Sequence, residues 1–164
     1  YSYITCNIDN KFNKYIVFRQ ITKEVDICLY INFIYKKEWD MKIRTGTDII
    51  EINRVKKAIE ETEKKFCGRV YTQDEIEYCE SKNAQKYQHY AARFAAKEAV
   101  FKALSATLDS KYDIEWKDIE IKNDDYGRPY IKLNEKFTEA IENIDISISH
   151  CKEYAVASVV LIER

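Results

Sequence analysis

Charged side chains interrupt an otherwise apolar, alanine-rich segment, RFAAKEAVFK, between Arg93 and Lys102. Glu98 and Lys102 are four residues apart, so they would be neighbours on one face of a helix. Such a pair is often a surface ion pair that adds little stability. The apolar surroundings favour a second interpretation, because charges on a largely buried helix must face solvent, a partner chain or a ligand.

Asp48 is a second carboxylate in apolar surroundings, within residues 47–52. It could cap the helix that follows, or it could meet a cationic partner or a metal ion, since burying a lone carboxylate is costly. Together with Glu98 it would supply two hard oxygen ligands, and Mg²⁺ commonly takes one or two carboxylates beside phosphates and waters. The two residues are 50 positions apart, so spacing alone does not bring them together.

Two further segments could bind an anion. His150 ends an alternating segment at a tight turn, next to Ser149, and it is either a surface residue or a donor to a phosphate oxygen. Residues 127–129, of sequence Gly-Arg-Pro, form either an ordinary turn or an exposed loop that offers N–H groups and a guanidinium to an anionic nucleotide. A structural role is favoured for the other histidine, His89.

The helices that would carry these residues are predicted from composition and caps. Residues 85–106 give the strongest helix prediction: alanine is dense, glycine and proline are absent, and apolar positions go nearly all round, as in buried helices. Residues 53–65 predict a charged, exposed helix. Thr72 predicts the start of another that ends near residue 81, since Glu75 three residues later completes a capping box.

Two strand regions would flank these helices. Residues 43–52 predict a strand that enters a helix, and Gly46 within it allows a close backbone approach. The alternating residues 119–122 and 130–133 lie on either side of a turn-rich loop, so they predict a β-hairpin.

The C-terminal part predicts a second hairpin. Residues 144–150 alternate between apolar and polar types, and residues 154–161 are densely apolar. The second of these strands is therefore expected to be central in its sheet. A short helix is expected before the hairpin, over residues 134–142.

Composition excludes several classes of function. With 46% hydrophobic residues the 164-residue chain is globular, and a formal net charge of −1 gives no global basis for nucleic-acid binding. Five cysteines without a Cys-x-x-Cys spacing favour reduced thiols and a reducing compartment over disulfides or a cysteine-based zinc site. The longest apolar stretch, residues 27–35, is too short to cross a membrane.

Four blocks of the chain, in order and at similar spacing, resemble the holo-acyl-carrier-protein synthase family of phosphopantetheinyl transferases. The resemblance runs from about residue 43 to residue 163, and the blocks are residues 46–54, residues 66–71, residues 93–103, and residues 127–129 with 147–150. It implies a compact α+β 4'-phosphopantetheinyl transferase fold: an antiparallel sheet with a long buried helix, assembled as a homotrimer with active sites between subunits. The transferase domain would be residues 41–164, preceded by an N-terminal extension, residues 1–40, that packs on it.

The resemblance also implies roles for individual residues. Asp48 and Glu98 match the Mg²⁺ ligands, and Lys102 matches the lysine near the reacting phosphates. Arg54 matches a position that meets the acidic carrier protein. The residues assigned to coenzyme A are Arg93, Lys97, Lys102, Gly127, Arg128, Pro129, Ser149 and His150.

The implied reaction is transfer of 4'-phosphopantetheine from coenzyme A to a serine of apo-acyl carrier protein, with Mg²⁺, for type II fatty acid synthesis. Adenosine 3',5'-bisphosphate would be released. The expected compartment is a plastid-type organelle or the cytoplasm, with no membrane or nucleic-acid partner. Two alternatives are a non-catalytic trimer of the same fold that binds coenzyme A or a nucleotide, and a purely structural trimer.

The chain departs from the family pattern at three places. Arg44 stands where a small residue is usual, and His89 replaces a residue that is usually apolar. The helix expected to dock the carrier protein mixes lysines with glutamates, so a purely basic docking face is not expected.

Overall fold

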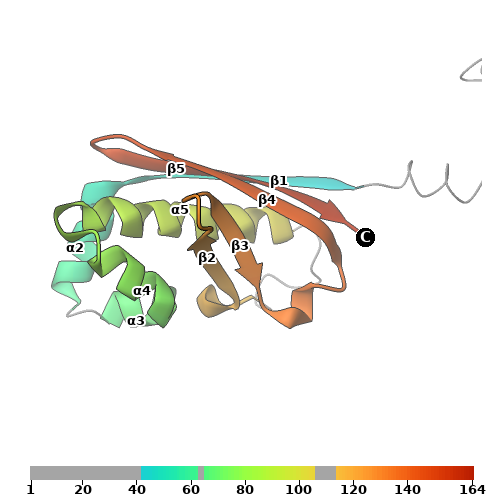
Figure 1. Cartoon of the computed structure of the whole chain (residues 1–164), viewed down its shortest axis with the longest axis horizontal. Helices are drawn as coiled ribbons and strands as arrows, with labels where there is room; N and C mark the ends of the chain where they lie inside the picture. Colours follow the sequence, from blue (N-terminus) through green and yellow to red (C-terminus); the bar gives the residue numbers. More distant parts are fainter. Residues whose placement is uncertain (1–41, 63–64, 106–113) are drawn as a thin grey trace, which may run out of the picture. The chain divides into compact units, whose positions relative to one another are not determined.

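A three-stranded antiparallel sheet packed on one long helix, α5 (Lys86–Leu104), forms the centre of the fold (Figure 1). The computed structural model describes residues 42–62, 65–105 and 114–164. The predicted N-terminal extension, residues 1–40, lies outside the described residues. The combination of antiparallel sheets with helices confirms the predicted α+β class.

The sheet has the strand order β1-β5-β4, built from β1 (Ile43–Glu51), β5 (Tyr154–Glu163) and β4 (Ile141–His150). The prediction that the last strand is central is confirmed. Its alternate residues Ala155, Ala157, Val159 and Leu161 are buried, because they face α5. The intervening residues lie on the outer face of the sheet.

Gly46 lets β1 approach α5 closely, as predicted. A Cβ atom at this position would overlap the backbone carbonyl oxygen of Ala99 and lie 2.8 Å from the amide nitrogen of Ala103. The small side chains of alanines on α5 also allow this close approach. Ala95, Ala96 and Ala99 are fully buried. This close approach sets the distance between the side chains of β1 and those of α5.

Three short helices follow β1: α2 (Ile52–Glu61), α3 (Lys65–Val70) and α4 (Gln73–Glu80). They gather at one end of α5 (Figure 1). The predicted helix over residues 53–65 is shorter than expected, because α2 ends at Glu61. The predicted capping box of α4 is confirmed: the Glu75 amide donates to the Thr72 hydroxyl, and the Thr72 amide donates to the Glu75 carboxylate.

The predicted first hairpin is confirmed as β2 (Ile119–Asn123) and β3 (Pro129–Leu133), an antiparallel pair beside α5. Three 3-10 helices complete the described elements: η1 (Asn83–Gln85), η3 (Trp116–Asp118) and η4 (Glu135–Phe137). The predicted short helix over residues 134–142 is wrong. Only the turn η4 is helical, because the chain from Ile141 onwards pairs with β5 as strand β4.

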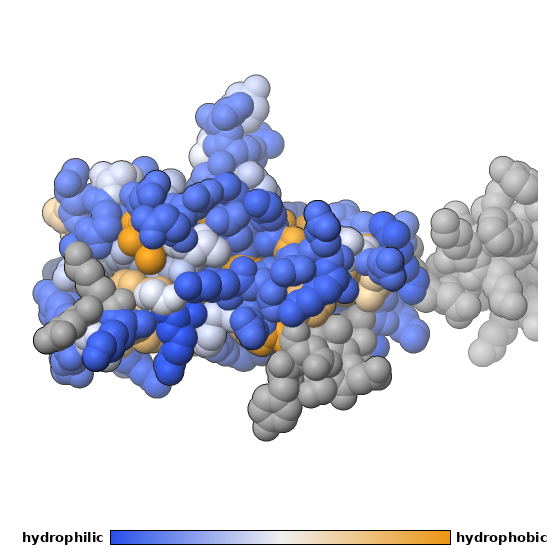
Figure 2. Space-filling view, turned by 90° about the horizontal axis from the view of Figure 1, so that it is seen from below, coloured by the Kyte–Doolittle hydropathy of each residue, from blue (hydrophilic) through white to orange (hydrophobic). Residues whose placement is uncertain are grey.

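Seen from the side away from the three-stranded sheet, the surface is mainly hydrophilic, and apolar residues show as separate small patches (Figure 2). Among the helices that the structure describes, none has the length and apolar character needed to cross a membrane.

Candidate functional site

Asp48 and Lys102 form the first part of the site. Strand β1 carries Asp48 on the face that packs on α5, in register with Gly46 and Ile50. The Lys102 ammonium donates to Asp48 Oδ1 and to the carbonyl oxygen of Thr47, each at 2.8 Å. Of the two interpretations left open for Asp48, the structure shows the cationic partner, since no side-chain cap of α2 is formed.

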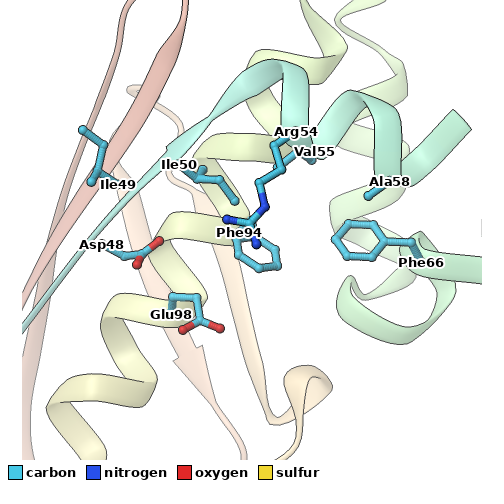
Figure 3. Close-up of a pocket in the computed structure, with 9 residues that line it drawn as sticks. All are labelled: Asp48, Ile49, Ile50, Arg54, Val55, Ala58, Phe66, Phe94 and Glu98. Atoms are coloured by element: carbon cyan, nitrogen blue, oxygen red, sulfur yellow. The ribbon is translucent and has the colours of Figure 1, made fainter. Parts of the chain in front are cut away.

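Glu98 lies one turn before Lys102 on α5, and its carboxylate points toward the same space as that of Asp48 (Figure 3). Burial raises the pKa of Glu98, the nearby Asp48 carboxylate raises it further, and Lys102 partly opposes both. Two carboxylates that repel each other in this way gain from a cation placed between them. Lys102 already supplies one such cation on the Asp48 side.

A hollow of about 420 Å³ opens beside these carboxylates, and both Asp48 and Glu98 line it. Its other walls are largely apolar and come from β1, α2, α3 and α5, with Phe66 facing Phe94 (Figure 3). Arg54 on α2 is exposed and its guanidinium enters the hollow. The arrangement therefore offers two carboxylates, an arginine and an apolar wall to one incoming group.

The donor set at this hollow fits a hard divalent cation. Within the described ranges, no group of three or more His, Cys, Asp or Glu side chains converges as a complete metal cage. Mg²⁺ is usually held by only one or two carboxylates, with waters and substrate phosphates as its remaining ligands. Asp48 and Glu98 match this pattern.

Arg93 organises the second part of the site, and it is 4% exposed. Its Nη2 donates to Asn123 Oδ1 at 2.9 Å, and the Asn123 amide donates to the carbonyl oxygen of Gly127 at 2.8 Å. Asn123 therefore ties Arg93 to the predicted loop of residues 127–129. Sequence reasoning missed Asn123, although its place just before the turn was a signal that could have found it.

The loop between β2 and β3 has the geometry of a tight, exposed turn. Gly127 has a positive φ of 81°, which favours glycine. Asp124 Oδ1 accepts hydrogen bonds from the amides of Tyr126 and Arg128. Arg128 and Pro129 line a hollow of about 490 Å³ together with β4 residues that include Ser147.

His150 and Ser149 end β4 on opposite faces of the sheet. His150 is exposed, and its ring packs against that of His89 with centroids 6.0 Å apart. Ser149 pairs with Val156 and lies on the outer face with Ser147. Within one chain, Ser149 is therefore not brought to the group that contains Arg93 and His150.

Lys97 is placed differently from the other predicted coenzyme A ligands. It is fully buried, and its ammonium lies 2.8 Å from Glu75 Oε2 while donating to the carbonyl oxygens of Trp116 and Ile119. Burial lowers its pKa and Glu75 opposes this. These three partners occupy its three N–H groups, so we assign Lys97 a structural role in place of the predicted contact with coenzyme A.

The two parts of the site lie on different sides of α5. Glu98 follows Arg93 by five residues, which is a rotation of roughly 140° about the helix axis. One chain therefore brings together two separate groups. The first is Asp48, Glu98, Lys102 and Arg54, and the second is Arg93, His150 and the loop of residues 127–129.

Arg44, a departure from the family pattern, donates a hydrogen bond to Glu163 at 2.8 Å.

Comparison with known proteins identifies relatives over most of the chain. Residues 44–159 match the family model of the 4'-phosphopantetheinyl transferase superfamily. A holo-acyl-carrier-protein synthase of Ruminiclostridium cellulolyticum is 48% identical over 126 residues, covering 74% of this chain and 92% of the relative.

Solved structures of such synthases share the fold. One from Bacillus anthracis, in complex with coenzyme A (3',5'-ADP), is 38% identical, with a TM-score of 0.62 and coverage of 76% of this chain and 99% of that chain. One from Helicobacter pylori, in complex with coenzyme A, is 31% identical, with a TM-score of 0.63 and coverage of 71% and 98%. The predicted fold is thereby confirmed.

Proposed function

Because the chain belongs to the holo-acyl-carrier-protein synthases of the 4'-phosphopantetheinyl transferase superfamily, we propose that it transfers 4'-phosphopantetheine from coenzyme A to a serine of apo-acyl carrier protein. The serine hydroxyl releases its proton to solvent as its oxygen forms a bond to the β-phosphorus of coenzyme A, and the bond from that phosphorus to the bridging oxygen breaks. Adenosine 3',5'-bisphosphate leaves. The observation that carries this proposal is the pair of convergent carboxylates, Asp48 and Glu98, with Lys102 beside them.

Catalysis of phosphoryl transfer depends mainly on positioning and on neutralising charge. Asp48 and Glu98 would hold Mg²⁺, which supplies positive charge to the pyrophosphate oxygens when bound. Lys102 is half exposed, so its ammonium can reach a phosphate oxygen while Asp48 keeps it oriented. The apolar walls of the hollow, Phe66 and Phe94 among them, would exclude water from the attacking serine.

Arg54 supports recognition of the acidic carrier protein. Its guanidinium lies in the same hollow as the two carboxylates, so a carrier protein that meets Arg54 would have its serine near them. Charge-reversing Arg54→Glu is expected to raise KM for the carrier protein about tenfold and to leave coenzyme A affinity unchanged, because a rim charge mainly affects encounter with its partner. Steady-state kinetics with each substrate varied separately checks this.

Lys57→Glu is the matched control for that measurement. Lys57 is exposed on the same helix and undergoes the same change in charge, but it does not line the hollow. Equal increases in KM from both variants would contradict a specific contact at Arg54 and would indicate a general effect of charge.

The incomplete site in one chain supports assembly of several copies, and the family resemblance makes that assembly a homotrimer. Arg93 and His150 lie on a different side of α5 from Asp48 and Glu98, so one coenzyme A molecule would bridge residues of two copies. The outer face of the sheet fits contact between copies, because it carries the exposed residues Ile43 and Ile49 of β1 and Val160 of β5. Among the described elements, none covers this face (Figure 1).

Val160→Lys is expected to convert the trimer to monomers without unfolding the chain. Val160 is 47% exposed within one chain, so a lysine there is tolerated until copies associate. Light scattering should give three times 19.5 kDa for the wild type and one chain mass for the variant. Gln73→Lys, at an exposed position on α4, is the control and should stay trimeric. A trimeric Val160→Lys variant would exclude this face as the interface.

An assay for released adenosine 3',5'-bisphosphate distinguishes the transferase from the non-catalytic alternative. Product is expected only when coenzyme A, Mg²⁺ and apo-carrier protein are all present. Binding of coenzyme A without product would favour a binding protein. The family resemblance predicts that the chain acts in type II fatty acid synthesis, in a plastid-type organelle or in the cytoplasm.

A further inference from the structure

Three basic side chains, those of Lys82, His89 and Arg93, contact the ring of Tyr78 on α4, and His150 packs against one of them, His89. The Arg93 guanidinium lies 3.8 Å and the Lys82 ammonium 4.4 Å from the ring centroid. His89 packs edge-on against Tyr78, with centroids 5.5 Å apart, and also against His150 at 6.0 Å. The imidazole of His89 thus lies between an aromatic ring and a second imidazole, one helical turn before Arg93.

This basic corner, defined as Lys82, His89, Arg93 and His150, lacks acidic partners. Within the part of the chain that the structure describes, none of the four forms an ion pair. The Nε atom of Arg93 is buried without a hydrogen-bond partner, although the residue is only 4% exposed. An anion-binding site needs clustered basic side chains and free hydrogen-bond donors. The basic corner offers both.

His89 is uncharged at neutral pH in this corner. Burial is the first cause that lowers its pKa to about 4, followed by the positive charges of Arg93, Lys82 and His150. These three side chains face it from α5, from the connection after α4 and from the end of β4, while Tyr78 faces it from α4. A phosphate dianion would offset the positive charges, and an opposite charge at contact distance raises a pKa by about 1–3 units.

We propose that His89 is a positioning residue for the phosphate monoester of coenzyme A, and that its ring binds a proton from solvent more readily when that dianion is bound. This inference rests on the proposed function, which brings coenzyme A to Arg93 and His150. The neutral ring of His89 holds the ring of His150 at the edge of the corner. Once protonated, it adds a positive charge there, which an apolar residue at this position could not supply.

Calorimetric titration of the full chain with adenosine 3',5'-bisphosphate tests the proposal. Measurements near pH 5.5 in buffers of different ionisation enthalpy count the protons taken up. With a bound pKa of about 5–7, the wild type should take up about 0.2–0.9 proton more per site than His89→Phe, which keeps an aromatic ring but cannot be protonated. The affinities of the two proteins should differ by about 1.3- to 30-fold at pH 5.5 over that range of bound pKa, and they should converge at pH 8.

Failure of the role of His89 and failure of the proposed function give different results. Equal proton uptake by the wild type and His89→Phe, both binding the nucleotide, would overturn the role of His89 and leave the proposed function intact. A pH titration of the His89 ring by NMR gives a second readout, in which an unchanged midpoint on nucleotide binding would also overturn it. Absence of nucleotide binding by the wild type would overturn the proposed function, and this inference with it.

Discussion

Glu98→Gln is expected to lower the rate of phosphopantetheine transfer by at least about 1000-fold while the fold remains intact. The amide keeps the size of the side chain but removes one of the two carboxylates that would hold Mg²⁺, and a single lost electrostatic contact to a transition state reduces rates by about 10²–10³-fold. Losing the metal as well removes the charge next to the pyrophosphate. Transfer measured at saturating coenzyme A, carrier protein and Mg²⁺ checks this, with exposed Glu77→Gln as the control of unchanged activity.

The same variant should be more stable than the wild type when Mg²⁺ is absent. The pKa of Glu98 is raised by burial and by Asp48, so the native state holds a proton that the unfolded chain releases. Stability therefore falls as the pH rises from the ordinary carboxyl pKa through the raised one, and Glu98 remains unfavourable above that range. Thermal unfolding at neutral pH should give a higher Tm for Glu98→Gln, and Mg²⁺ should raise the Tm of the wild type alone. Full activity, or an equal response to Mg²⁺, would contradict the assignment of Glu98.

Gly46→Ala is expected to lower the free energy of unfolding by at least about 4 kcal/mol, a loss of the size found for severe packing defects. The new Cβ would overlap the carbonyl oxygen of Ala99, which belongs to the backbone of α5 and cannot turn aside as a side chain can. Strand β1 must then move away from the helix, and Asp48 moves with it. Urea denaturation followed by circular dichroism measures the loss in the free energy of unfolding.

Gly68→Ala provides the matched control. Gly68 lies in α3, where an added Cβ meets no atom within 4 Å, and alanine is the better helix former. Its stability should equal or slightly exceed that of the wild type. If Gly46→Ala unfolds at the same urea concentration as the wild type, the close approach of β1 to α5 is not what holds the site together.

The sequence predicted the elements whose signals are local. The capping box at Thr72 and Glu75, the alanine-rich α5 and the tight turn at Gly127 each depend on residues within a few positions of one another. The central place of β5 was also predictable, because a dense apolar run needs partners on both sides.

Side-chain partners far apart in the chain were not predictable in the same way. Lys97 and Lys102 are both lysines of one helix, yet Lys97 is buried against Glu75 and Lys102 is half exposed beside Asp48. Their spacing on α5 cannot show which face meets α4 and which meets β1. The bridge through Asn123 depends likewise on how the β2–β3 hairpin packs on α5. Tertiary packing, which the local pattern does not contain, decides these roles.

Catalysis of phosphopantetheine transfer, and not only binding of coenzyme A, is the expected activity of this chain. Intact-mass spectrometry of apo-acyl carrier protein, after incubation with the chain, coenzyme A and Mg²⁺, tests it most directly. The carrier protein should gain the mass of one phosphopantetheine group on its serine, and Glu98→Gln should leave its mass unchanged over the same time. An unchanged mass with the wild-type chain, under conditions in which that chain binds coenzyme A, would contradict the claim.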